Sequence, residues 1–98
     1  MRVIAKSALV EYYEKHSAAK DALLEWYDIT KKAEWKTFAD IKNDFNTVSS
    51  VGNQRYVFNI KGNDFRLIVV IHFTPQRVYI RFIGTHAEYD KITDIQNL

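Results

Sequence analysis

The sequence predicts an α+β domain in which two or three N-terminal helices pack on one face of a small antiparallel sheet. Two observations predict this fold. Apolar residues recur at helical spacing in the first part of the chain, and from Tyr56 onward they alternate with period two. A chain of 98 residues is long enough for one hydrophobic core. We therefore expect residues 1–98 to form a single domain.

The composition is that of a globular protein, with 47% hydrophobic, 14% aromatic and 27% charged residues. The chain has no cysteine, which excludes disulfides and thiolate metal sites. No apolar signal core follows Arg2, and no segment approaches the roughly 20 apolar residues of a membrane span. We expect a cytoplasmic protein without a membrane partner.

The first helices are predicted from caps and spacing. Val3 and Ile4 fit a short strand, and Ser7 is a candidate N-cap for a helix that ends near Lys15. A second helix is expected from Ser17, because apolar residues recur there three and four positions apart. These residues are Ala19, Ala22, Leu23, Trp26, Ile29 and Ala33.

Trp26 is assigned to core packing rather than to stacking on a nucleobase, because aromatic residues at helical spacing usually face the core. Thr37 and Asp40 fit a capping box that opens a short helix. Residues 45–54 are expected to form a long loop, since they are rich in Asn, Ser and Gly.

The first hairpin of the sheet is predicted from alternation and a turn. Residues 56–60 and 65–73 alternate, and Gly62-Asn63 suits a tight connection that places Asn59 opposite Arg66. The odd residues of the second strand form an apolar row that we expect to face the helices. The even residues include Ile68 and Val70 as well as Arg66 and His72.

In the last strand, residues 77–83, the inward row shifts to even positions. Val78, Ile80 and Phe82 are expected inside, with Arg77, Tyr79 and Arg81 outside. For these arginines to share a face with Arg66, the loop around Pro75 must hold an even number of residues, and we expect four.

The positive charge of the chain belongs to the predicted sheet. Residues 1–50 carry eight lysines and arginines against eight acidic residues, whereas residues 53–87 carry a single acid, Asp64. The basic residues of the second range are Arg55, Lys61, Arg66, Arg77 and Arg81. Because the planar guanidinium group suits phosphate, this composition favours a phosphate-bearing partner.

One face of the sheet is expected to display polar side chains from all three strands. They are Arg55, Asn59, Lys61, Arg66, His72, Arg77, Tyr79 and Arg81. Such a set suits a polyanion that carries bases, and an ordinary solvated sheet surface is the alternative. The near absence of carboxylates argues against Mg²⁺-dependent phosphodiester chemistry. We expect no metal ion and no cofactor.

Several segments carry a resemblance to a known family. They are Tyr56-Val57-Phe58-Asn59, Gly62-Asn63, Phe65-Arg66-Leu67, Tyr79-Ile80-Arg81 and the run GTHAEYD at residues 84–90, together with Trp35-Lys36 and Asp40-Ile41-Lys42 upstream. Over nearly the whole chain these segments resemble the HigB family of type II toxins, which are relatives of the RelE fold.

The resemblance implies a ribosome-dependent endoribonuclease that cuts mRNA in the ribosomal A site and halts translation. It implies a HigA-type antitoxin with a helix-turn-helix domain as partner, so that operator DNA is bound only through the antitoxin. Toxins of this fold use the 2′-hydroxyl of the substrate as nucleophile and leave a 2′,3′-cyclic phosphate. Such a reaction needs a base, an acid and cations at the phosphate, and no metal ion.

Roles follow as hypotheses from this chemistry. Arg66 and Arg81 are assigned to phosphate and transition-state contacts, and His86 to acid or base catalysis. Tyr89 is assigned to base stacking or proton transfer. The expected RNA-binding residues are Arg55, Asn59, Lys61, Arg77 and Tyr79.

Structural roles are the alternatives for several of these residues. His86 could be a hydrogen-bonded structural residue, Tyr89 could pack on the sheet edge, and Asp90 could cap the helical turn or orient His86. Two other functions also remain open. The domain could bind RNA or a ribosomal surface without cleavage, or it could share the fold and act on a topoisomerase.

Overall fold

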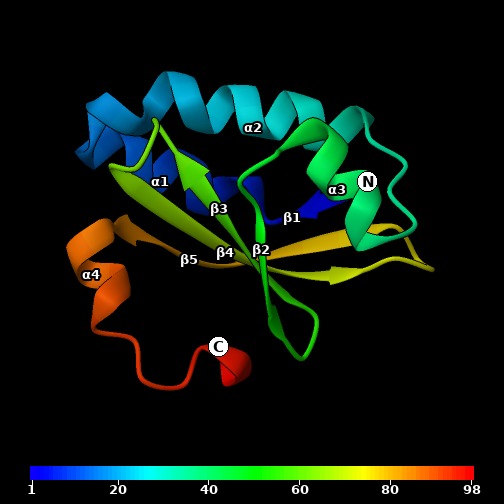
Figure 1. The fold of residues 1–98 in the computed structure, drawn as a ribbon. Helices are drawn as coiled ribbons and strands as arrows, with labels where there is room; N and C mark the ends of the chain where they lie inside the picture. The colour runs from blue at the N-terminus through cyan, green and yellow to red at the C-terminus, as the bar shows by residue number, and fades with distance from the viewer.

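The computed structural model describes residues 1–98 as one five-stranded sheet with helices on one side and the C-terminal end of the chain on the other (Figure 1). The strands lie in the order β1-β5-β4-β3-β2. The strands are β1 (Arg2–Ile4), β2 (Ser49–Gly52), β3 (Arg55–Ile60), β4 (Phe65–His72) and β5 (Arg77–Thr85). The helices are α1 (Lys6–Lys15), α2 (Lys20–Lys32), α3 (Phe38–Asp44) and α4 (His86–Asp90), with 3₁₀ turns at Ser17–Ala19 and Ile95–Asn97. The α+β prediction is confirmed.

The sheet is larger than the three-stranded meander that alternation predicted. β1 pairs with β5 in parallel, which confirms the short N-terminal strand and makes the sheet mixed. The prediction of a long loop at residues 45–54 was wrong, because β2 lies within it and pairs antiparallel with β3. β2 has the sequence SSVG and is an exposed edge strand, so no apolar alternation marked it.

The helical layer forms largely as its spacing predicts. α2 buries Leu23, Trp26 and Thr30 on one side, which confirms the packing assignment of Trp26. The capping box of α3 is present, because the Asp40 backbone N–H donates to Thr37 Oγ1 and the Thr37 N–H donates to Asp40 Oδ2. Ser7 is not the cap of α1, since the helix begins one residue earlier and Ala5 precedes it.

Phe58 of β3 is the centre of the core between sheet and helices. Its side chain is 1% exposed and meets Trp26 and Phe45 edge to face, with ring centroids 5.5 and 5.1 Å apart. The Trp35 ring stacks at 6.3 Å. The odd residues of β4 complete this core, as predicted.

The registers of β4 decide which side chains share a face. Asn59 pairs with Arg66 and His72 pairs with Arg77, so the predicted hairpin register and the predicted four-residue loop are both confirmed. Opposite Ile68 and Val69, however, β5 contains a bulge. Arg81 is the extra residue there, and the alternation of β5 reverses beyond it.

The bulge makes one sequence prediction wrong. Phe82 pairs with Ile68 and lies on the side of the sheet away from the helices, whereas Ile83 packs against the helix-side core in its place. A strict period of two cannot account for an inserted residue, and nothing in the sequence marks the insertion.

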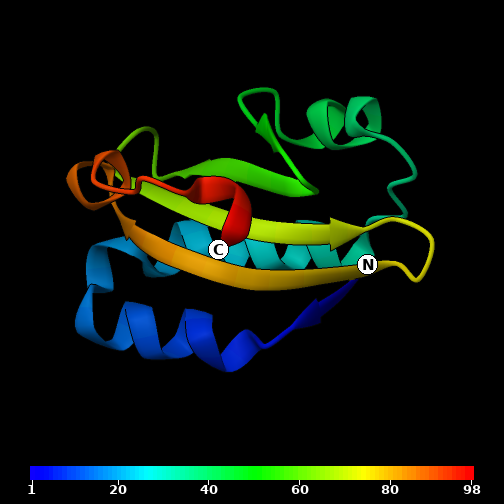
Figure 2. The ribbon, with the colours of Figure 1, turned by 90° about the horizontal axis from the view of Figure 1, so that it is seen from below.

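The outer face of the sheet is not an open surface. Val57, Ile68 and Val70 are 0–3% exposed, yet they lie outside the helix-side core. Figure 2, which views the molecule from this side, shows the end of the chain crossing in front of the sheet at β4. We call residues 91–98 the C-terminal segment, and it divides the outer face into two polar regions, one at each end of β4.

We expect Ile68→Val to lower the free energy of unfolding by about 0.5–1.5 kcal/mol, because a methyl group is removed from a fully buried site. Urea denaturation measures this change. Thr47→Ser is the matched control, since it also removes one methyl but from an exposed residue, with an expected change within about 0.5 kcal/mol. Equal small changes in both variants would contradict burial of the outer face.

Candidate functional site

The candidate site lies where the turn between β3 and β4, residues 61–64, meets the N-terminus of α4. The two parts are joined by a hydrogen bond from the His86 backbone N–H to the Asp64 carbonyl oxygen, 3.1 Å long. The turn needs left-handed backbone at Lys61 (φ 53°) and Gly62 (φ 64°). Glycine adopts this conformation without strain, which explains its place in the turn.

Arg66 is the central cation of the site. Its Nη1 donates to the side-chain oxygens of Asn59 and Asn63, with 2.6 Å to Asn63. Its guanidinium carbon lies 5.4 Å from the centre of the Tyr89 ring. These partners hold the side chain in one orientation without neutralising it, so its positive charge remains available to a phosphate group.

His86 is oriented by a carboxylate of the same helix. Its Nδ1 lies 3.0 Å from Asp90 Oδ2, and the two side chains are 42% and 59% exposed. Residues four apart face each other on a helix, so the HAEYD sequence is sufficient to form this pair. With Nδ1 directed at Asp90, the Nε2 atom is the one that can exchange a proton with a substrate.

Tyr89 links the two halves of the site. It follows His86 by three residues, and the two rings meet edge to face at 6.4 Å. Its other neighbour is the Arg66 guanidinium. Arg66, Tyr89 and His86 therefore form a continuous row, built from β4 and α4.

The start of α4 is fixed by a second capping box. The Glu88 N–H donates to Thr85 Oγ1 at 3.2 Å, and Glu88 Oε1 accepts from the Thr85 N–H at 2.8 Å. The hydrogen bonds from Thr85 lower the pKa of Glu88 below its ordinary value of 4.5. Glu88 is thus an ionised cap. Gly84, opposite Arg66, packs closely, because a Cβ there would lie 2.5 Å from the tip of the Phe82 ring and the ring would have to shift.

A second group of predicted residues lies toward the other end of the sheet. Tyr79 meets His72 edge to face at 5.5 Å, and the Arg81 guanidinium carbon lies 5.9 Å from its ring. Arg77 pairs with His72 and is exposed. Gly84 is the residue of β5 opposite Arg66, and Arg81 comes three residues before Gly84. Arg81 is therefore about 10 Å from the position opposite Arg66, measured along the strand.

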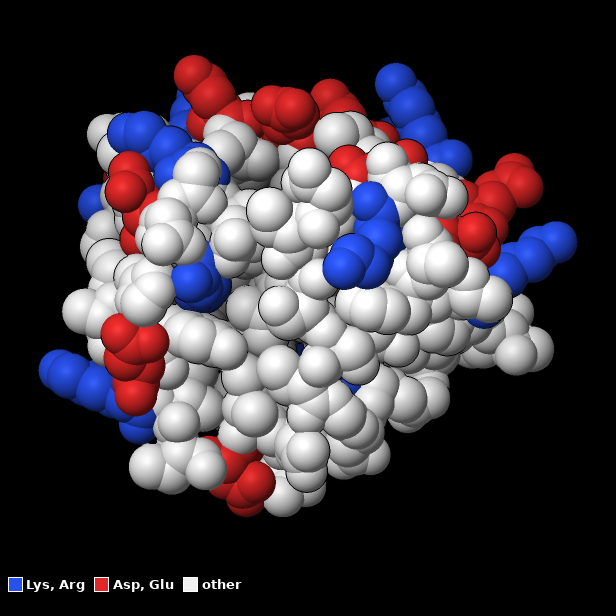
Figure 3. All heavy atoms as spheres, viewed as in Figure 1, with Lys and Arg blue, Asp and Glu red and all other residues white.

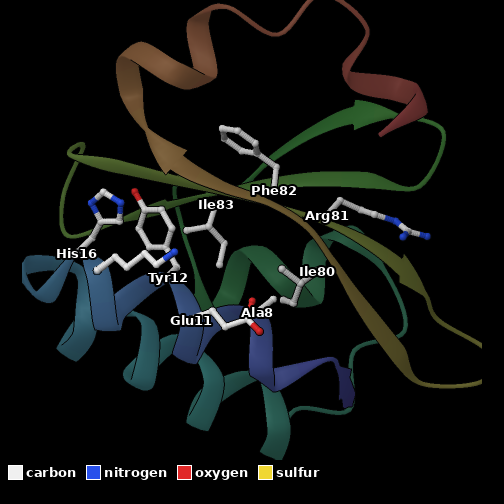
Figure 4. Close-up of a pocket in the computed structure, with 9 residues that line it drawn as sticks. Ala8, Glu11, Tyr12, His16, Ile80, Arg81, Phe82 and Ile83 are labelled. Atoms are coloured by element: carbon white, nitrogen blue, oxygen red, sulfur yellow. The ribbon is translucent and has the colours of Figure 1, made fainter.

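Arg81 also borders a cavity of 320 Å³ between α1 and β5 (Figure 4). In this view Arg81 points away from His16 and Tyr12, which lie at the far end of the cavity. The Tyr12 hydroxyl has no hydrogen-bond partner, and burial, followed by the charge of Glu88, raises the pKa of this phenol. A tyrosine with a raised pKa stays protonated at neutral pH.

The two remaining predicted residues differ in their surroundings. Lys61 is exposed in the turn beside Arg66. The guanidinium of Arg55 is already hydrogen-bonded to other residues of the chain, since it donates to the main-chain oxygens of Asn53 and Leu98. Figure 3 shows acidic and basic side chains side by side along the helical layer at the top of the view, in agreement with the balanced charge of residues 1–50.

The comparison with protein families identifies the chain. Residues 19–92 match the family described as HigB toxin, the RelE-like toxic component of a toxin-antitoxin system. The chain belongs to the HigB toxin family. Its membership as a toxic component implies an antitoxin partner.

Curated relatives of this HigB chain cover almost its full length. It is 30% identical over 95 residues to the mRNA interferase HigB of Escherichia coli O6:H1 strain CFT073, covering 95% of this chain and 92% of the relative. It is 31% identical over 97 residues to the mRNA interferase toxin HigB of Escherichia coli K12, and to that of Shigella flexneri, covering 97% of this chain and 93% of each relative. No helix of the structure has the length and apolarity needed to span a membrane.

Two residues that sequence reasoning did not include among the site residues lie in the site. Asn63 accepts from Arg66, and Asp90 orients His86, one of the roles considered for it. Both could be found from local spacing, since Asn63 is three residues before Arg66 and Asp90 is four residues after His86. The C-terminal segment carried no comparable signal.

We expect Glu88→Gln to reduce the sensitivity of the protein to acid. Because folding lowers the pKa of Glu88, the negative charge of Glu88 stabilises the native state at pH values above about 4.5. This stabilisation is lost as the pH falls below that value. Glutamine keeps the capping oxygen but has no charge to lose. Urea midpoints at pH 7, 4 and 3 should therefore fall further for the unmodified protein than for Glu88→Gln. Parallel curves would contradict this account.

Proposed function

We propose that this chain is an endoribonuclease that cuts mRNA on the ribosome, acts without a metal ion, and is held inactive by a HigA-type helix-turn-helix antitoxin in the cytoplasm. The observation that carries the proposal is the row Arg66, Tyr89, His86, in which an unneutralised guanidinium stands beside an imidazole oriented by a carboxylate. The full-length similarity to proteins named mRNA interferases supports it.

In the proposed reaction the 2′-oxygen of the substrate attacks the adjacent phosphorus, and the bond from phosphorus to the 5′-oxygen breaks. His86 Nε2 exchanges the proton of the attacking or the leaving oxygen, while Asp90 holds the imidazole in place through Nδ1. Arg66 stabilises the negative charge that develops on the phosphorane oxygens. The products are a 2′,3′-cyclic phosphate and a free 5′-hydroxyl.

The other residues have supporting roles. Tyr89 keeps the Arg66 guanidinium in place and offers a ring on which an unstacked base can lie. Lys61 adds a positive charge within the turn. Arg77, Tyr79 and Arg81 lie too far along β5 for the same phosphate as Arg66, and we assign them to neighbouring nucleotides.

Two carboxylates of the site, both on α4, are already engaged, whereas the third, Asp64, is exposed in the turn. Asp90 contacts His86, and Glu88 caps α4 through Thr85. Metal-assisted phosphoryl transfer uses carboxylates that converge on an ion. The engagement of both side chains in helix contacts supports a reaction driven by Arg66 and His86.

We expect Arg66→Ala to reduce mRNA cleavage about 10²–10³-fold, because it removes a cation from the developing charge. We expect His86→Ala to reduce it about 10²–10⁴-fold, because it removes a proton-transfer group. Cleavage is measured in a reconstituted translation system, with and without ribosomes. Lys32→Ala is the control, since it removes an exposed cation from α2, in the helical layer.

The outcomes separate the candidate functions. Ribosome-dependent cuts that vanish in both site variants support the proposal. Inhibited translation with intact message would show a binding domain that does not cleave. Unaffected translation with altered DNA supercoiling would point to a topoisomerase target instead.

We expect cleavage to need the 2′-hydroxyl of the cut nucleotide and to be insensitive to EDTA. A message with a single 2′-deoxynucleotide at the mapped cut should remain intact there, because the nucleophile is missing, while cuts elsewhere continue. EDTA-treated protein should retain its activity on ribosomes that are supplied with magnesium, which tests for a tightly bound metal ion in the protein. Cleavage of the 2′-deoxy message at the same position would require a different nucleophile.

A further inference from the structure

Arg55 is the one predicted RNA contact whose guanidinium is already occupied by the chain itself. Its Nη2 donates to the Leu98 carbonyl oxygen at 2.6 Å, and its Nη1 donates to the Asn53 carbonyl oxygen at 2.9 Å. Arg55 also lies four residues before Asn59 on β3, about 13 Å of strand from the site. It is therefore poorly placed to share a phosphate with Arg66.

Further contacts attach the C-terminal segment at the same place. Gln96 Nε2 donates to the Val51 carbonyl oxygen at 2.9 Å, and Asn53 Nδ2 donates to the Gln96 carbonyl oxygen at 2.8 Å. The packing is close, because a Cβ on Gly52 would lie 2.6 Å from Gln96 Nε2. The segment is thus anchored on β2 and β3 through its 3₁₀ turn.

The helix that carries His86 and Tyr89 is short and continues into this anchored segment. α4 has five residues and buries none of them, and a helix of that length is not stable alone. Its N-terminus is fixed by the capping box and by the bond from His86 to Asp64. Its C-terminus continues directly into the C-terminal segment, beginning with a bond from the Ile92 N–H to the Tyr89 carbonyl oxygen.

We propose that Arg55 is a positioning residue, which anchors the C-terminal segment and thereby keeps α4 in the orientation that sets Tyr89 against Arg66 and His86 beside it. Its effect on cleavage rests on the proposed function, whereas its anchoring of the segment does not. The guanidinium of Arg55 is directed at main-chain oxygens of Asn53 and Leu98, and we assign it a geometric contribution to the reaction.

The geometry requires an arginine at this position. Two nitrogens of one planar group reach two carbonyl oxygens on different segments, and an ammonium group cannot reproduce that fork. Arg55→Lys keeps the charge and loses the fork. Because a phosphate ligand would also lose its fork in this variant, measurements made without RNA are needed to separate an anchor from an RNA ligand.

The anchor is tested without RNA by amide hydrogen exchange. In Arg55→Lys and in Gln96→Ala, the amides of residues 86–98 should exchange about 5–10-fold faster, while those of β4 stay within about twofold, because the opening is local. Lys32→Ala, on α2, is the control. Unchanged exchange in residues 86–98 would overturn the proposal. Gln96 is exposed, so its variant keeps the test valid if Arg55→Lys fails to fold.

The consequence for catalysis is tested by single-turnover cleavage on programmed ribosomes. Both variants should cut about 3–10-fold more slowly at saturation, with the half-saturating concentration within about twofold, because binding groups stay in place while the reacting groups are misplaced. A raised half-saturating concentration with normal saturated rates would make Arg55 an RNA ligand and overturn the positioning role. Faster exchange in a protein whose unmodified form never cleaves would refute the nuclease and leave the anchor supported.

Discussion

The burial of β4 on both faces is the constraint on which the rest of the structure depends. Every residue from Leu67 to Ile71 is at most 3% exposed. If only one face of β4 were apolar, the helices alone would bury it. Ile68 and Val70 are apolar residues of the other face, which must therefore be shielded from water as well. The helices supply one cover and the C-terminal segment supplies the other (Figure 2). Apolar burial therefore determines where the end of the chain lies.

The same constraint explains why the chemistry sits at the ends of the strand. Polar side chains on the outer face can stay accessible only where the C-terminal segment does not cover them. Arg66 and His72 are the polar residues of β4 beyond its buried stretch, and each is joined there by partners from neighbouring strands. At the Arg66 end of β4 these partners are Asn59 and α4, and at the His72 end the partner is Tyr79. Two separate polar regions result, in place of the continuous basic face that alternation predicts.

What could be predicted from the sequence was local. The capping box at Thr37 and Asp40, the pairing of Asn59 with Arg66, and the four-residue loop before Arg77 each depend on a few neighbouring residues. The candidate site could be predicted for the same reason, because its residues come from one turn and one short helix. Reading the spacing of His86 and Asp90 was enough to suggest their contact.

The features of the fold that the sequence did not predict depend on an inserted residue or on contacts between segments far apart in the sequence. The bulge at Arg81 reverses the faces of Phe82 and Ile83, and a fixed period of two cannot register it. The short edge strand β2 lacks apolar alternation altogether. The apolar side chains of Ile68 and Val70 were the one available signal for a second cover. That signal could not say which part of the chain provides it.

The placement of the acidic residues shows how the site keeps its charge. A carboxylate 4 Å from Arg66 would interact with it by about 4 kcal/mol at an effective dielectric constant of 20, and a phosphate would have to compete with that attraction. The chain instead surrounds Arg66 with the side-chain amides of Asn59 and Asn63 and the ring of Tyr89. These neutral groups fix the orientation of the guanidinium without neutralising its positive charge. Asp90 is directed to His86 by helical spacing, and its carboxylate orients the imidazole through Nδ1. The site thus keeps the carboxylate with the proton-transfer group and leaves the guanidinium free for phosphate.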